Sequence, residues 1–312
     1  MIEAPSKSEI PSPKFIAGLD LGGTEIKCGA FDENGQLVAK CIMPTRDGEM
    51  VDDHPAFVSE VKRGLHELSQ QLNQGFDRVG LAAPGLAARG ETCIAFMPGR
   101  LRGIEGLNWA TALGISNKVP VLNDAHAALL GEVWQGAARN RQHVVLLTLG
   151  TGVGGAIMVD GKLLKGEIGR AGHLGHMTVD HHGPPTITGT PGGIELAIGN
   201  ATLSERTGGR FTMTRDLATA AQSGDTFAQR IWRDSVHALA AHIAGLICAL
   251  DPECIVIGGG LSELDGFLFD PLVEFLDSFE WRPNGHRVPI AKAALGSWAG
   301  AYGAAYYTTT LP

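Results

Sequence analysis

Two glycine-rich turns, each set between a buried strand and a second strand, constrain the fold of this chain more than any other feature. The first follows the apolar run 15–21, whose one acid is Asp20, and precedes the extended pattern 26–31. The turn itself consists of Gly22, Gly23 and Thr24. Because glycine lacks Cβ, the N–H groups of such a turn can approach an anion closely.

Three polar groups around the first turn favour a phosphate site over a plain glycine-rich hairpin, which is the alternative. Thr24 adds a hydroxyl donor and Lys27 a nearby positive charge. Asp20, at the mouth of the turn, is placed to hold a hydrated metal ion.

The second turn follows the apolar strand 142–149 and resembles the first. Gly150, Gly152 and Gly155 satisfy the dinucleotide fingerprint GxGxxG, which requires a helix to follow. Residues 156–159 instead continue as a strand, so we reject a dinucleotide site. The repeated strand–turn–strand unit predicts a duplicated α/β domain with a cleft between its halves.

Asn123 and Asp124 lie between a strand end at 119–122 and a helix expected over 125–134. Asp124 is suited to capping that helix. It is also suited to taking a proton from a substrate hydroxyl at the mouth of a cleft, and the two roles are compatible. A second strand, 78–83, ends at Gly85, and the carboxyl ends of strands are where α/β sheets bind ligands.

Two further segments carry polar or glycine-rich patterns. Four histidines gather at His173, His176, His181 and His182, without a zinc-binding spacing. We expect polar substrate contacts there, with a metal cluster or a solvated loop as alternatives. Glu195 opens a short helix, where it suits the helix dipole. A third glycine turn, 258–260, follows a strand and precedes a helix, which lets the backbone lie against a nucleotide base or ribose.

The totals exclude several classes of protein. The net charge is −8 and no basic block occurs, which argues against nucleic acid as a partner. The five cysteines form no CxxC pair, which favours reduced thiols in the cytoplasm. No apolar run reaches the ~18 residues of a membrane span. Residues 1–14 are expected to form a flexible tail.

From Phe15 to the C-terminus the chain resembles the ROK family of sugar kinases and sugar-responsive repressors, part of the actin-like ATPase superfamily. The segments that carry the resemblance are 20–27, 122–128, 149–155 and 257–262, in the family's order. The resemblance implies two actin-like ATPase (ribonuclease H-like) domains across a cleft. We expect these domains over 15–125 and 126–296, with a C-terminal helix, about 297–312, packing back on the first.

The resemblance also implies a function, the ATP-dependent phosphorylation of a hydroxyl on a hexose or hexose derivative. Asp124 would be the general base, as phosphoryl transfer needs positioning, charge neutralisation and one group to orient the nucleophile. The implied sugar contacts are Gly85, Asn123, Asp124, His173, His176 and Glu195. The implied ATP contacts are Asp20 (through water and Mg²⁺), Gly22, Gly23, Thr24, Lys27, Gly150, Thr151, Gly152, Gly259 and Gly260. A homodimer is expected on the same ground.

Three departures from the family pattern bear on specificity. His173 stands where the family has a sugar-contacting glutamate, and a ring that can donate replaces an anion that only accepts. His126 stands where the family has an asparagine. The cysteines of the family's zinc knuckle are missing from 182–195, with Gly193 at one of their positions. We therefore expect no zinc, which leaves His176 for the sugar.

Other functions remain open on the sequence. One is a catalytically weak sugar-binding protein of the same fold, since a fold alone does not certify activity. Another is a kinase that uses polyphosphate or another donor, although the glycine turn 258–260 favours a nucleotide. A transcription regulator would need a helix-turn-helix of about 60 residues before the first strand. Only 14 residues stand there, which disfavours it.

Overall fold

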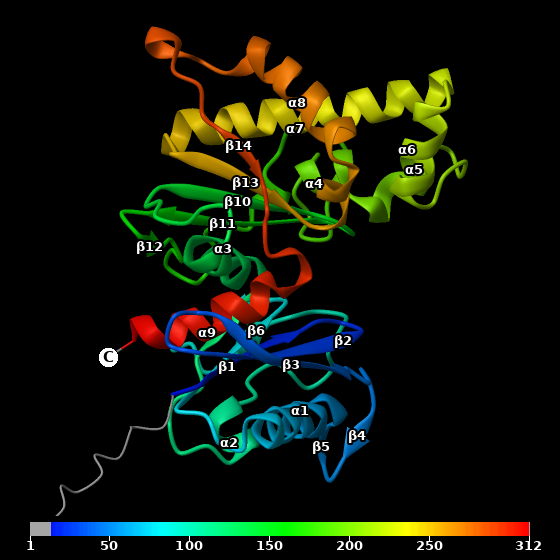
Figure 1. Ribbon diagram of the computed structural model, residues 1–312. Coiled ribbons are helices and arrows are strands. Elements are labelled where there is room, and N and C mark those ends of the chain that lie inside the picture. Colours follow the sequence, from blue (N-terminus) through cyan, green and yellow to red (C-terminus); the bar gives the residue numbers. More distant parts are fainter. Residues whose placement is uncertain (1–13, 312) are drawn as a thin grey trace, which may run out of the picture.

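The computed structural model describes residues 14–311 and forms two lobes, each built on a five-stranded sheet (Figure 1). The expected tail, 1–14, lies outside the described residues except for Lys14. In the N-terminal lobe the strand order is β3-β2-β1-β6-β9. The bounds are β1 Ile16–Leu21, β2 Glu25–Phe31, β3 Leu37–Pro44, β6 Arg78–Ala83 and β9 Val121–Asn123.

The C-terminal lobe repeats this topology with the order β12-β11-β10-β13-β14. Its strands are β10 Val144–Leu149, β11 Val153–Val159, β12 Lys162–Leu163, β13 Cys254–Gly258 and β14 Ile290–Lys292. In each lobe the first strand pairs antiparallel with the second and parallel with a later one, β1 with β6 and β10 with β13. The predicted duplicated α/β fold is confirmed.

The first strand of each sheet is apolar because both of its faces are covered. All residues of β1 are buried except Asp20, and all residues of β10 except Thr148, each of which is half-buried. The two exceptions occupy the same position, one residue before the strand ends. A covered strand therefore delivers one polar side chain to the site in each lobe.

Helices cover the outer faces and fill the space between the sheets (Figure 1). The amphipathic helix α1 (Ala56–Leu72) packs on the N-terminal sheet from outside. Helices α3 (Asp124–Gln135) and α9 (Ala299–Thr310) pack against each other between the sheets. The other helices are α2 Trp109–Leu113, α4 Ile194–Ile198, α5 Leu203–Arg206, α6 Thr214–Gln222, α7 Thr226–Leu250 and α8 Gly266–Phe279.

The small residues of α9 allow its close approach to β1 and β6. A Cβ at Gly18 would lie 2.0 Å from the carbonyl oxygen of Ala301, and one at Gly80 would lie 2.0 Å from that of Ala304. Helix α9 thus lies on the N-terminal sheet although it ends the chain. The domain bounds given above remain a prediction.

Several short elements were not expected from the sequence. They are the hairpin of β4 (Met50–Val51) with β5 (His54–Pro55), and that of β7 (Leu86–Ala87) with β8 (Ile94–Phe96). Single 3₁₀ turns occur at Leu174–His176, Asn200–Thr202, Gly260–Leu264, Pro283–Gly285 and Gly296–Trp298. Within 14–311 no helix combines the length and apolar character needed to cross a bilayer.

Candidate functional site

The cap of α3 is Asn123, and the interpretation of Asp124 as the cap was wrong. The Asn123 Oδ1 atom accepts the N–H groups of Ala125 and His126, at 3.0 and 3.2 Å. Its Nδ2 atom donates to the Gly85 carbonyl oxygen at 3.0 Å. The cap falls one residue earlier because Asn123 is the last residue of β9 and has extended backbone angles. One side chain thus joins the ends of β6 and β9.

Asp124 is the first residue of α3 and is exposed to the space between the lobes. One carboxylate oxygen accepts the Ala125 N–H at 2.8 Å, which leaves the other available to a ligand. The surrounding protein raises the pKa of Asp124, an effect partly offset by that N–H and by the charges of His173 and Arg100.

Asp20 lies within electrostatic reach of Asp124. Burial and, to a smaller extent, the charge of Asp124 raise the pKa of Asp20 to about 7, against the lowering effect of Lys27. Two carboxylates that repel each other in this way would be relieved by a cation. Since Mg²⁺ keeps several waters and binds through one or two carboxylates, this donor set fits a hydrated magnesium ion.

The first turn is held by Thr45. Its hydroxyl donates to the Gly22 carbonyl oxygen at 2.7 Å, and its N–H donates to that of Thr24 at 2.9 Å. Neither Gly22 nor Gly23 adopts a left-handed φ. At Gly22 space explains the glycine, since a Cβ there would lie 2.9 Å from the Glu25 carbonyl oxygen. The Lys27 ammonium pairs with Glu25 at 2.7 Å, beside the turn.

The second turn is braced by its neighbours. The N–H groups of Asn200 and Ala201 donate to the carbonyl oxygens of Gly150 and Thr151, both at 2.9 Å. A Cβ at Gly152 would lie 3.0 Å from the Glu195 Oε2 atom, so this turn and the start of α4 touch.

The third glycine turn lies against the second. Gly259 has φ +82°, and a Cβ there would lie 2.4 Å from the carbonyl oxygen of Leu149, the last residue of β10. Gly260 by contrast faces open space, since no atom lies within 4 Å of its Cβ position. The turn therefore offers one bare backbone face beside the second phosphate-type turn.

His176 and Glu195 meet across the start of α4, with the Nδ1 and Oε1 atoms 3.2 Å apart. The carboxylate raises the pKa of His176. These two atoms are buried, yet neither has a geometrically aligned hydrogen-bond partner among the described residues. The two atoms face each other in this ion pair, which orients both side chains and leaves His176 Nε2 and Glu195 Oε2 as the atoms open to a ligand.

His173 and His126, two of the departures from the family pattern, lie close together with ring centroids 6.1 Å apart. Burial lowers the pKa of His126 to about 4 and also lowers that of His173. His126 Nε2 donates to the Ala171 carbonyl oxygen at 2.9 Å. His173 Nδ1 donates to that of Arg170 at 3.2 Å, which leaves Nε2 of the neutral His173 ring as an acceptor.

The segment between His176 and Glu195 is closed by hydrogen bonds within the chain. The Val179 N–H donates to the Gly192 carbonyl oxygen at 2.8 Å, and the Ile194 N–H to that of Met177 at 3.0 Å. At its tip the hydroxyls of Thr186, Thr188 and Thr190 form a chain, with separations of 2.9 and 3.2 Å. We call 179–192 the threonine turn. Gly193 lies against Gly175: a Cβ added to Gly193 would lie 3.0 Å from the Gly175 carbonyl oxygen.

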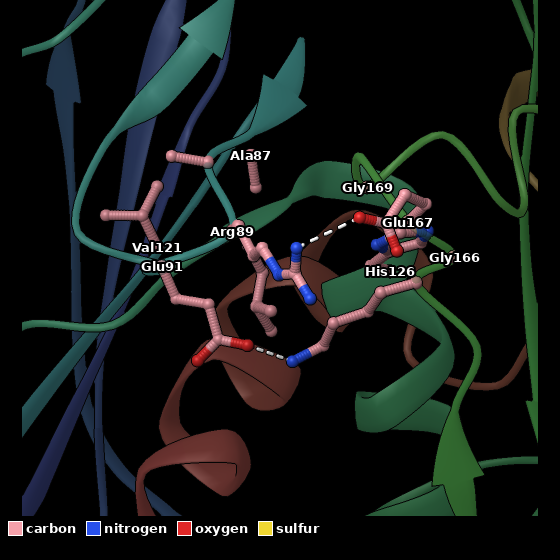
Figure 2. A pocket seen from close by; sticks show the side chains of 11 residues that line it. Ala87, Arg89, Glu91, Val121, His126, Gly166, Glu167 and Gly169 are labelled. Carbon is pink, nitrogen blue, oxygen red and sulfur yellow. Dashed lines mark hydrogen bonds and ion pairs between the residues drawn. The ribbon is translucent and has the colours of Figure 1, made fainter.

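An interlobe pocket of about 90 Å³ lies beside this site (Figure 2). Arg89 of the N-terminal lobe pairs with Glu167 of the C-terminal lobe at 3.0 Å, and Glu91 pairs with Lys165. The Tyr307 hydroxyl of α9 also donates to Glu91, at 2.6 Å. The pocket is lined by His126 but not by Asp124, the next residue but one before it in α3.

One residue of this site, Arg100, was missed by sequence reasoning. Its Nη1 atom lies 3.4 Å from the Cβ position of Gly23, and its charge acts on Asp124. Arg100 belongs to the irregular stretch 86–118, where no periodic pattern or motif singles it out. Only the folded chain brings it to the first turn.

The candidate metal ligands are few. Within 14–311 no three of the His, Cys, Asp and Glu side chains form a group that could hold a metal ion. His181 and His182 are exposed, with ring centroids 3.9 Å apart and the ring planes tilted by 43°, and take no part in the site. The expectation that the protein carries no zinc remains a prediction.

Two lobes of the same topology, with glycine turns from both lobes and acids at the strand ends, define the actin-like ATPase fold. Within that class, the family model described as "ROK family" matches residues 16–310, and the chain belongs to this family.

Relatives with stated activities span most of the chain. The glucokinase of Thermotoga maritima is 33% identical over 290 residues, 85% of this chain and 87% of that protein. The N-acetylmannosamine kinase of Shigella flexneri is 30% identical over 294 residues, 93% of this chain and 97% of that protein. A ROK family glucokinase from Streptomyces griseus, solved with glucose and AMPPNP, superposes with a TM-score of 0.74 and 26% identity, covering 94% of this chain and 98% of that one.

Proposed function

We propose that this protein is a sugar kinase that transfers the terminal phosphoryl group of ATP to a hydroxyl of a hexose or hexose derivative. The observation that carries the proposal is the placement of Asp124. Its free carboxylate oxygen faces the space between the lobes, within electrostatic reach of Asp20 and of an arginine beside the first glycine turn. The relatives named glucokinase and N-acetylmannosamine kinase support the substrate class.

In this proposal Asp124 accepts the proton of the attacking hydroxyl. Its raised pKa makes it a better base than a solvated carboxylate, because a base works best when its pKa approaches the working pH. The Ala125 N–H fixes one oxygen and so directs the other towards the substrate. Asp20 would hold magnesium through water, and the bound ion would neutralise charge on the phosphates.

The sugar would be gripped from both lobes. Asn123 holds the Gly85 carbonyl in place and keeps one amide N–H free for a hydroxyl. His176 and Glu195, held together by their ion pair, would present Nε2 and Oε2 to sugar hydroxyls. His173 would accept a hydroxyl proton through Nε2, as the family's glutamate would, but without its negative charge. Because a neutral ring replaces a carboxylate at this position, we expect an uncharged donor of the sugar, such as a hydroxyl, to meet His173.

The nucleotide would lie across the two glycine turns. The N–H groups near Gly22, Gly23 and Thr24 approach the phosphates from one lobe, with Lys27 nearby. Gly150, Thr151 and Gly152 would approach them from the other, and Gly259 and Gly260 would lie by the adenosine. This arrangement supplies the positioning on which phosphoryl transfer depends.

The test is Asp124→Asn, which keeps the shape of the side chain and removes its basicity. We expect turnover to fall at least ~100-fold, the lower range for loss of a general base. ATP and sugar binding should stay nearly unchanged in calorimetry. A variant that retains wild-type turnover would remove Asp124 from the mechanism.

A sugar panel with a coupled ADP assay would define the substrate. If the wild-type protein binds a sugar but forms no sugar phosphate, and the sugar does not stimulate ATP hydrolysis, the catalytically weak sugar-binding alternative holds. Sugar phosphate formed from polyphosphate but not from ATP would favour the other-donor alternative.

We also infer a homodimer in the cytoplasm. All five cysteines are free, as suits a reducing compartment, and the dimer rests on the family resemblance. Light scattering that gives the mass of one chain would contradict the dimer.

A further inference from the structure

Arg100 lies at the first glycine turn without a partner of its own. Its Nη1 atom is 3.4 Å from the Cβ position of Gly23, and no other atom lies within 4 Å of that position. Its side chain is exposed and, within the described residues, makes no hydrogen bond or ion pair. Two carboxylates, Asp20 and Asp124, are close enough to interact with each other, yet neither pairs with it.

The loop that carries Arg100 is fixed rather than loosely solvated. The carboxylate of Asp47 accepts the N–H groups of Leu101 and Arg102, at 2.9 and 3.1 Å. The side chain of Leu101 is fully buried, although its φ of +51° is unusual for a leucine. Surroundings that hold a leucine in this conformation also fix where the preceding side chain begins.

The charge of Arg100 reaches both parts of the proposed reaction. It lies at the turn that would cradle the phosphates, and it lowers the pKa of Asp124, the proposed base. In the proposed reaction the phosphoryl group passes from the nucleotide at the first glycine turn to the sugar hydroxyl at Asp124. A guanidinium presents several N–H donors in a plane that matches phosphate oxygens, and it keeps its charge at any working pH.

We propose that Arg100 contacts the phosphoryl group of ATP as it is transferred, and neutralises the charge on its oxygens. This inference rests on the proposed function. The bond from phosphorus to the bridging oxygen of ADP breaks, and a bond to the sugar oxygen forms. The hydroxyl proton passes to Asp124, and Arg100 keeps all its protons throughout.

The closing experiment compares Arg100→Ala and Arg100→Lys with the wild-type protein. Because the side chain is exposed and unpaired, neither change should alter the melting temperature. We expect Arg100→Ala to lower kcat about 100-fold, the usual loss when one donor to a developing charge is removed. Arg100→Lys should recover part of that loss.

Nucleotide binding gives a readout that does not need turnover. We expect Arg100→Ala to weaken binding of AMPPNP about tenfold while leaving ADP binding unchanged, because only the former carries the terminal phosphate. Arg102→Ala is the matched control. It removes an equal charge two residues away in the same loop, from an exposed side chain with no contact to the turn, and should change neither value.

Three outcomes would overturn the proposal while leaving the proposed function intact. One is that Arg100→Ala leaves both kcat and the ratio of the AMPPNP and ADP dissociation constants unchanged. A second is a shift in the acidic limb of the pH profile alone, which would mean that Arg100 only tunes Asp124. The third is a rise in KM confined to sugars that carry an anionic group. A wild-type protein that forms no sugar phosphate would instead refute the proposed function, whatever the binding ratio shows.

Discussion

The two glycine turns have the same origin in the fold but different surroundings. Each follows the covered first strand of its sheet, and each strand leaves one polar residue half-buried, Asp20 in β1 and Thr148 in β10. Around the first turn the neighbours are charged, with Lys27 near Asp20 and Arg100 near Gly23. Around the second turn the neighbours are backbone groups and the start of α4.

This difference shows how a duplicated scaffold divides its work. The scaffold repeats what depends on local pattern, namely strand, turn and strand. The surroundings of the two turns differ because distant segments pack on them. The loop of Arg100 packs on the first turn, and the turn at Gly259 packs beside the second. The first turn can therefore supply charge, whereas the second is held rigidly against the start of α4, which carries Glu195.

The most severe test of this comparison is Gly259→Ala, behind the second turn. A Cβ there meets the Leu149 oxygen at 2.4 Å, and the φ of +82° is costly for alanine. We expect a loss of about 3 kcal/mol in the free energy of unfolding, from strained backbone and overpacking. Chemical denaturation measures it. A loss below about 0.5 kcal/mol, the size of an ordinary surface change, would mean that the second turn is not braced from behind.

A matched pair of alanine substitutions compares the turns directly. Gly152→Ala puts a Cβ 3.0 Å from Glu195 Oε2 and should raise the KM for sugar about tenfold, a loss of about 1.4 kcal/mol. Gly23→Ala meets only the far end of Arg100, at 3.4 Å, and should affect ATP kinetics while leaving the sugar KM unchanged. Steady-state kinetics with each substrate varied separates the two. Equal effects of both variants on the sugar KM would break the comparison.

The smallest expected effect concerns the charge at the first turn. The pKa of Asp20 is raised to about 7 from 3.8. Between about pH 4 and 7, therefore, Asp20 is protonated in the folded protein but ionised in the unfolded chain. This acid therefore lowers stability as the pH rises from about 4 to 7, and the cost persists above pH 7. Asp20→Asn should raise the melting temperature at pH 8 by ~2–4 °C, or roughly 1 kcal/mol, and change it little at pH 4.

The counterpart in the second lobe supplies the control. Thr148→Val keeps the shape at the equivalent position and carries no titratable group, so its effect on the melting temperature should be the same at both pH values. Asp20→Asn should at the same time lower turnover, because the proposed magnesium ligand is lost. A difference in melting temperature between Asp20→Asn and the wild type that is the same at pH 4 and at pH 8 would refute the charged character of the first turn.

Elements set by local pattern were predictable from the sequence. Strand 78–83 has the predicted bounds, and β11 follows the second turn, as the rejection of a dinucleotide site required. Such elements follow from apolar periodicity and from turn residues that act over a few positions. The fold class could be predicted for the same reason, since it depends on the order of these elements.

Features that depend on distant contacts could not be predicted. The position of Arg100 depends on Asp47, which holds the neighbouring Leu101. His126 and His173 were noted as separate departures, but only the fold shows that they meet. The cap of α3 fell to Asn123 because β9 extends one residue further than the apolar pattern indicated. In each case a hydrogen bond or contact between segments distant in sequence determines where the residue lies.

The threonine turn has a consequence for the conditions under which this chain can reach its working form. In the zinc knuckle that the family resemblance implies, thiolates would tie this segment. Oxidants attack thiolates, and such a metal must be acquired during folding. Here hydroxyls and carbonyls set the spacing of His176 and Glu195, and neither group is redox-active. We therefore expect the spacing of His176 and Glu195 to form without added zinc and to withstand peroxide that would dismantle a thiolate knuckle.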